Sequence, residues 1–119
     1  MVAGVVTGIA ARNARKLVRF GSEAEAIASK EAGKLLPKPG HVGQPKWIGL
    51  EGTIDPGKLG QSKNYTYKVT MNMRQDMKEW LNNSANTIMK PNEPGRWGIK
   101  AEKLSEFNSQ IESLTVKKR

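Results

Sequence analysis

The residues of this sequence best suited to bind an anion are Arg19 and the segment around it. Leu17 to Ser22 has the pattern of a strand ending in a glycine turn, and Ser22 with Glu25 has the spacing of a capping box that starts a helix. A helix N-terminus offers free N–H groups and a positive dipole end, beside which an arginine adds a fixed guanidinium. The segment therefore predicts a seat for a phosphate or pyrophosphate, although an arginine that only solvates an edge strand fits the same pattern.

A second candidate is Glu93, in the loop between Pro91 and Gly95. Two prolines restrict the backbone of this loop, so the carboxylate is expected at a fixed place before the strand predicted for 96–100. Because Arg19 is predicted at a strand end and Glu93 at a strand entrance, we expect the two side chains to face one cleft. His41 lies between two glycine-containing turns and is a candidate general base. The alternatives for these two side chains are an exposed turn glutamate and a surface histidine.

Several kinds of chemistry are excluded by what the sequence lacks. It has no cysteine and one histidine, which argues against a thiolate nucleophile and a histidine-rich metal site, and we predict no metal. Neither a Gly-x-Gly-x-x-Gly nor a Walker motif occurs. Trp47 and Trp97 fall in predicted strands, where packing is the usual role of tryptophan and stacking on a nicotinamide or a base the rarer one.

The composition is that of one small basic domain. The chain has 119 residues, with 20 Lys and Arg against 11 Asp and Glu, and a formal net charge of +9. Such a positive field favours nucleic acid, a nucleotide or an acidic protein surface as partner. The longest apolar run, residues 2–11, is about half the length of a membrane span, so no membrane partner is expected.

The order of elements predicts a compact α+β domain of short antiparallel strands with two or three short helices. Strands are predicted at 17–22, 44–51, 64–73, 87–89, 96–100 and 111–116, and helices at 23–33, 76–81 and 101–108. Residues 1–16 are predicted as a linker or N-terminal helix, and 17–119 as the catalytic domain. Because an apolar run directly follows Met1, we expect the chain to be the C-terminal piece of a longer parent.

Local patterns also predict details of these elements. The alternation from Tyr65 to Met73 predicts a strand that lines the core. Asp76 and Glu79 predict a capping pair for the helix they begin. The buried face of the first helix is predicted from its apolar residues, Ala24, Ile27, Ala28 and Leu35.

A resemblance to a known family rests on three segments: Arg19–Ala26 (RFGSEAEA), Pro39–Ile48 (PGHVGQPKWI) and Asn92–Ile99 (NEPGRWGI). They resemble the C-terminal toxin domains of Rhs polymorphic toxins, and most of all the Tre group of ADP-ribosyltransferase effectors, of the type that modifies elongation factor Tu. The resemblance implies an ADP-ribosyltransferase-like fold and transfer of ADP-ribose from NAD to a protein of the translation machinery. It also implies a secreted effector that acts in the cytoplasm of a target bacterium and has a cognate immunity protein.

The resemblance further implies which residues form the site. Glu93 would be the catalytic glutamate, and the NAD-binding residues would be Arg19, Phe20, Gly21, Ser22, Lys46 and Trp47. Two features differ from the family pattern. The Ser-x-Ser element of the middle strand is replaced by the segment 44–47, and position 91 is proline, so there is no Glu-x-Glu pair.

The principal alternative is a toxin ribonuclease of the barnase, EndoU, colicin and RelE kind that cleaves tRNA. Such enzymes share the size, the α+β layout and the basic charge of this chain. His41 with Lys46 and Arg96 would then supply general acid–base and phosphate-binding groups. A non-enzymatic nucleic-acid binder is a third possibility, but it would be expected to show more surface aromatic residues among its basic ones.

Overall fold

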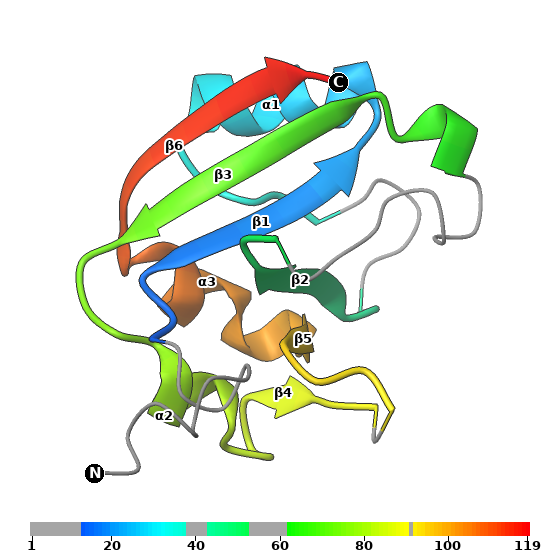
Figure 1. The fold of residues 1–119 in the computed structure, drawn as a ribbon. Coiled ribbons are helices and arrows are strands. Elements are labelled where there is room, and N and C mark those ends of the chain that lie inside the picture. The colour runs from blue at the N-terminus through cyan, green and yellow to red at the C-terminus, as the bar shows by residue number, and fades with distance from the viewer. Residues whose placement is uncertain (1–12, 38–42, 53–61, 91) are drawn as a thin grey trace, which may run out of the picture.

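The part of the chain that the structure describes folds as an α+β domain with one six-stranded antiparallel sheet and three short helices, which confirms the predicted α+β class (Figure 1). The computed structural model describes residues 13–37, 43–52, 62–90 and 92–119. His41, with the rest of 38–42, lies outside the described residues. None of the helices among the described residues is long and apolar enough to cross a membrane.

The bounds of the elements follow the sequence closely. The strands are β1 (Lys16–Gly21), β2 (Lys46–Leu50), β3 (Tyr67–Met73), β4 (Thr87–Ile88), β5 (Arg96–Ile99) and β6 (Ile111–Lys118). The helices are α1 (Glu23–Ala32), α2 (Lys78–Leu81) and α3 (Leu104–Asn108), with 3₁₀ turns η4 (Ser62–Asn64) and η5 (Ala101–Lys103). β6 is two residues longer than predicted, because Lys117 and Lys118 continue its ladder with β3.

The strand order in the sheet is β4-β5-β2-β1-β3-β6. β1 pairs with β3 along its whole length, but with β2 through only two pairs, Leu17–Leu50 and Val18–Gly49. Beyond Val18 the two strands are no longer registered with each other. The sheet is therefore split on the side of β1 where Arg19 lies.

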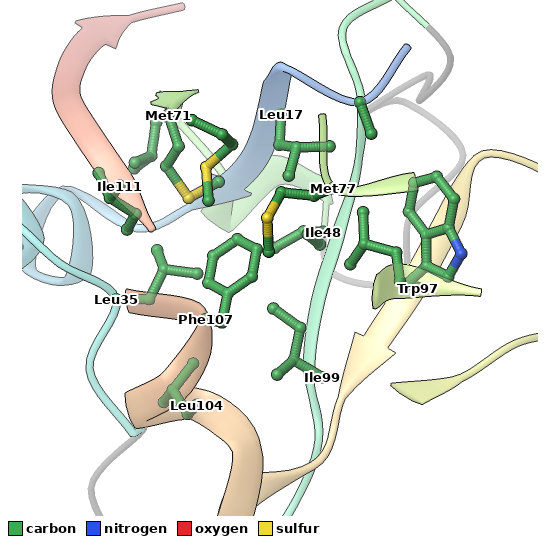
Figure 2. Packing of buried hydrophobic residues seen from close by; sticks show 14 of the residues in the cluster. Leu17, Leu35, Ile48, Met71, Met77, Trp97, Ile99, Leu104, Phe107 and Ile111 are labelled. Carbon is green, nitrogen blue, oxygen red and sulfur yellow. The ribbon is translucent and has the colours of Figure 1, made fainter. Parts of the chain in front are cut away.

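The core lies on one face of the sheet, here called the inner face. Alternate strand residues point toward it, as the period of two requires. The buried cluster combines them with residues of all three helices (Figure 2). Its members from β1, β2, β3 and β5 are Leu17, Ile48, Leu50, Val69, Met71, Met73, Trp97 and Ile99, and α2 and α3 add Leu81, Leu104 and Phe107. The prediction that the 65–73 stripe lines the core is confirmed for Val69, Met71 and Met73.

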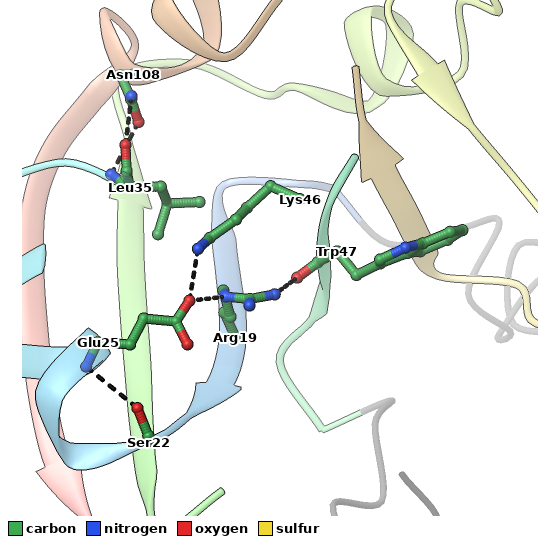
Figure 3. A network of polar contacts seen from close by, with 7 residues as sticks. All are labelled: Arg19, Ser22, Glu25, Leu35, Lys46, Trp47 and Asn108. Carbon is green, nitrogen blue, oxygen red and sulfur yellow. Dashed lines mark hydrogen bonds and ion pairs between the residues drawn. The ribbon is translucent and has the colours of Figure 1, made fainter. Parts of the chain in front are cut away.

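The caps of α1 form as predicted. Ser22 is the N-cap, its Oγ accepts a hydrogen bond from the N–H of Glu25 at 3.2 Å, and Gly33 closes the helix with a φ of 69°. Beyond the helix, Asn108 exchanges two hydrogen bonds with the backbone of Leu35 and so ties this segment to α3 (Figure 3).

One local prediction holds only in part and another is wrong. Leu35, beyond the end of α1, is buried as predicted, but Ala24 and Ile27 are exposed, and the buried residues of α1 itself are Ala26 and Ser29. The small side chains of the buried pair allow the helix to approach the sheet closely, which its apolar pattern does not reveal. Asp76 also makes no capping pair with Glu79, because its Oδ1 accepts from the N–H groups of Ala14 and Lys78.

Candidate functional site

Arg19 lies where β1 and β2 separate and bonds to both a helix and the neighbouring strand. Its Nε donates to Glu25 Oε1 at 2.7 Å, and its Nη1 donates to the carbonyl oxygen of Trp47 at 2.8 Å (Figure 3). The N–H of Leu50 donates to the carbonyl of Gly95, so the backbone groups of Leu50 point to the β5 side of β2. Because this direction alternates from residue to residue along a strand, the carbonyl of Trp47, three residues earlier, points toward β1. The guanidinium thus satisfies a carbonyl group that the split ladder leaves without a strand partner.

Glu25, in the first turn of α1, is the counter-ion of two cations. Its Oε1 lies 2.7 Å from Arg19 Nε and 2.6 Å from Lys46 Nζ. The side chains of Arg19 and Lys46 are only 17% and 7% exposed, so both charges are largely withdrawn from water. Gly21 leaves room for this carboxylate, because a Cβ at that position would come within 2.4 Å of Glu25 Oε2.

The pKa of Glu25 is held below its ordinary value. Burial by itself raises the pKa, but the charge of Arg19 and the hydrogen bonds from Arg19 and Lys46 outweigh it. Glu25 is therefore ionised at neutral pH. The guanidinium predicted to bind a phosphate or pyrophosphate is paired here with a carboxylate of the protein itself. The second half of the predicted capping box is accordingly replaced by these ion pairs.

The lowered pKa of Glu25 makes the stability of the fold depend on pH. A group whose pKa is lower in the folded state stabilises the fold fully above its unfolded pKa, here about 4.5, and this stabilisation is lost as the pH falls through the folded value. In thermal melts from pH 7 down to pH 3, we expect the difference in Tm between wild type and Glu25→Gln to shrink as the acid range is entered. A difference that stays constant down to pH 3 would contradict the ionised assignment.

A second cluster surrounds the indole ring of Trp47 on the other face of the sheet, here called the outer face. Arg96 Cζ and Lys90 Nζ each lie 5.1 Å from the centroid of this ring, a cation–π distance. Arg96 Nη1 also donates to Glu93 Oε1 at 3.1 Å, and Lys90 Nζ lies 3.9 Å from Glu93 Oε2. An aromatic face, two cations and one carboxylate are therefore held together at the entrance of β5.

The loop that carries Glu93 is held by backbone contacts. The N–H of Glu93 donates to the carbonyl of Lys90 at 3.0 Å, and the carbonyl of Gly95 accepts from the N–H of Leu50 at 2.9 Å. Gly95 has a φ of 79°, which only glycine adopts without strain. The side chain of Glu93 is 34% exposed. Its Oε2 is buried and makes no hydrogen bond among the described residues.

The ring of Trp47 rests on Gly98, which pairs with it across β2 and β5. A Cβ at Gly98 would lie 3.0 Å from two ring atoms of Trp47 and 3.2 Å from Pro45 Cβ. We expect Gly98→Ala to push the ring aside and to cost about 1–2 kcal/mol of unfolding free energy.

This cost of Gly98→Ala can be assigned to the ring by a double-mutant cycle. In a Trp47→Phe background the smaller ring leaves space for the methyl group, so the same substitution should cost less than half as much in chemical denaturation. Equal costs in the two backgrounds would show that the ring is not what the new methyl group meets.

The two clusters lie on opposite faces of the sheet. Leu17 belongs to the core, so Arg19, two residues later, also points to the inner face. Arg96 pairs with Gly49, which faces outward because its neighbours on β2 face inward. The prediction that Arg19 and Glu93 face one cleft is therefore wrong, because Arg19 points to the inner face whereas Arg96, which is bonded to Glu93, points to the outer face. Trp47 connects the clusters, because its carbonyl oxygen accepts a hydrogen bond from Arg19 and its ring makes a cation–π contact with Arg96.

The remaining predicted residues are distributed between these clusters. Gly21, Ser22 and Lys46 lie with Arg19, whereas Phe20 is on the outer face with the guanidinium of Arg119 5.5 Å from its ring. Sequence reasoning missed Lys90 and the ionic role of Glu25. The ionic role of Glu25 could have been predicted, because this acid lies three residues after the N-cap Ser22 and close in sequence to Arg19.

Among the described residues, no group of three or more His, Cys, Asp or Glu side chains could hold a metal ion. Two surface hollows lie away from both clusters, one beside α3 and one beside α2. Comparisons with protein-family models, curated protein sequences and solved structures give no significant match.

Proposed function

We propose that this protein is an NAD-dependent ADP-ribosyltransferase that modifies a protein of the translation machinery. The observation that carries the proposal is the double role of Trp47. Its carbonyl oxygen holds Arg19, and its ring holds Arg96, which in turn holds Glu93. Trp47 therefore connects Arg19, on the inner face, with Arg96 and Glu93, on the outer face, beside the split between β1 and β2.

The residues around the split fit the chemical groups of NAD. Arg19 and Lys46 already bind a carboxylate at 2.7 and 2.6 Å, and that carboxylate stands in for an anionic oxygen of a pyrophosphate. A bound pyrophosphate would take the place of Glu25 on these cations. A nicotinamide would stack on the ring of Trp47 only by displacing Arg96 and Lys90, which lie over it at 5.1 Å from its centroid. Because the two clusters lie on opposite faces, NAD would have to contact both faces of the sheet beside the split between β1 and β2.

The proposed roles follow from charge. Cleavage of NAD releases nicotinamide and transfers ADP-ribose to an acceptor side chain, which gives up a proton. Positive charge develops on the ribose as the bond to nicotinamide breaks, and the carboxylate of Glu93 would stabilise it. Arg96 Nη1, 3.1 Å from Glu93 Oε1, would orient that carboxylate. Arg19 and Lys46 would hold the pyrophosphate.

In the setting that the resemblance implies, the reaction is that of an antibacterial toxin. The proposed target is elongation factor Tu, the proposed place of action is the cytoplasm of a competing bacterium, and the proposed cognate partner is an immunity protein. The net charge of +9 supports a protein that binds acidic partners.

The direct test is incubation of the purified chain with NAD labelled on its adenylate part and a bacterial lysate. One labelled protein band that requires the chain is the expected result, and mass spectrometry of that band identifies the acceptor residue. Glu102→Gln, at an exposed position outside both clusters, is the matched control and should label normally. Absence of label with NAD left intact would refute the proposal.

A ribonuclease is the second candidate, and the cluster at Trp47 favours it. An aromatic ring for base stacking and two cations for phosphate lie within one patch, with Arg96 and Lys90 each 5.1 Å from the ring centroid. The acid–base set would also need Lys46, which lies on the inner face beside Glu25, and His41, which lies outside the described residues. The same lysate decides between the candidates, because a ribonuclease cleaves tRNA without transferring label.

A further inference from the structure

The outer edge of β6 is a long stretch of sheet edge with no neighbouring strand among the described residues. β6 is last in the strand order, and β3 is the strand that pairs with it. It spans eight residues without a proline, whereas the opposite edge of the sheet is the two-residue β4. The pairing of β6 with β3 shifts register between Asn72 and Met73 of β3, which lie opposite the first residues of β6. Short length, proline, bulges and lysine protect many sheet edges, and of these features the last six residues of β6 have only the two lysines, Lys117 and Lys118.

The backbone groups that point outward from this edge follow from the ladder. The N–H of Arg119 donates to the carbonyl of Thr66 at 2.8 Å, and bonded pairs alternate along antiparallel strands. Ser113, Thr115 and Lys117 therefore bond to β3. The N–H and C=O groups directed away from β3 belong to Leu114, Val116 and Lys118, and the structure gives these groups no partner among the described residues.

The charge around the edge selects the kind of strand that can pair there. Lys117 and Lys118 are exposed at the end of β6, and the whole chain carries a net charge of +9. A second copy of the chain would bring the same charge and be repelled, whereas an acidic segment would be attracted. A nucleic acid would satisfy the charge but lacks the regularly alternating donors and acceptors that the edge requires.

We propose that the edge from Leu114 to Lys118 binds an extended acidic segment of a protein partner, which adds to the sheet as a seventh strand. Main-chain hydrogen bonds would supply the affinity, and side chains on alternate sides the specificity. The partner strand would place apolar residues beside the half-buried Leu114 and Val116 on the inner face, and an acidic residue beside Lys117 on the outer face. The proposal does not depend on the proposed enzymatic activity.

The first test uses a disulfide-closed β-hairpin whose free strand alternates valine and glutamate. NMR titration of the full chain should show slowed amide exchange at Leu114, Val116 and Lys118. A hairpin with lysine in place of glutamate should bind at least tenfold more weakly, and added salt should weaken the acidic hairpin. Equal binding of both hairpins, or protection of these amides by a single-stranded oligonucleotide at lower concentration, would overturn the proposal.

The second test removes one outward N–H. Val116→Pro deletes a donor that makes no bond to β3, so the sheet should survive, and Val116→Ile is the control that keeps the donor. We expect the proline variant to bind the acidic hairpin about tenfold more weakly than the isoleucine variant. Thermal melts report whether both variants are folded. Equal affinities in two folded variants would overturn the proposal, and if the proline variant is unfolded the amide protection in wild type decides.

Discussion

Glu93→Gln is expected to reduce ADP-ribosyl transfer about a hundredfold or more. The amide keeps the shape of the side chain but removes the negative charge proposed to face the developing positive charge on the ribose. Preorganised electrostatic contacts of this kind are worth about 3 kcal/mol or more in the transition state. The measurement is the initial rate of label transfer from NAD at fixed target concentration, supported by toxicity on induced expression in cells without immunity.

The stability of the Glu93 variant should change little. Glu93 is bonded to Arg96 at 3.1 Å but keeps about a third of its exposure, and pairs of that kind contribute up to about 1 kcal/mol. Normal melting of the variant, together with normal activity of Glu102→Gln, would therefore assign the loss of activity to the charge at position 93. His41→Ala should be mild, because the proposed reaction has no step for an imidazole. The reverse order, with His41→Ala inactive and Glu93→Gln fully toxic, would favour the ribonuclease.

Glu25→Ala is expected to be the most destabilising charge substitution at the site. It leaves the side chains of Arg19 and Lys46, 17% and 7% exposed, without their shared carboxylate. Removing one partner of a fully buried ion pair costs about 3–5 kcal/mol. Because Glu25 retains 22% exposure and water can reach the site, we expect about 2–3 kcal/mol, or a decrease in Tm of roughly 10 °C.

The control for Glu25→Ala is Glu23→Ala. Glu23 lies in the same first turn of α1 but is exposed, so its removal costs only the interaction with the helix dipole, below about 1 kcal/mol. Chemical denaturation of the two variants should therefore differ by more than 1 kcal/mol. Similar costs would mean that the two cations find adequate hydration without Glu25, and the ion-pair account of the site would be wrong.

Local chemistry in the sequence determined the elements of this protein. The alternation of Val69, Met71 and Met73 produces a core strand, and Ser22 and Gly33 bound α1 through capping interactions that reach only three or four residues. Interactions of such short range depend only on residues that are neighbours in the sequence. The α+β class, the start of α1 and the loop at Glu93 could therefore be predicted.

Tertiary structure alone decided how the candidate residues meet. A shift of one residue in strand register reverses the face on which every side chain of a strand lies, so the sequence could not say that Arg19 and Arg96 point to opposite faces. The end of β1–β2 pairing at Val18–Gly49 is likewise a long-range event, and it frees the carbonyl of Trp47 for Arg19. The anion seat was predicted from residues within one turn of each other. Its occupation by Glu25 depends on Lys46, a residue from another strand, which contacts the carboxylate at 2.6 Å only after the chain has folded.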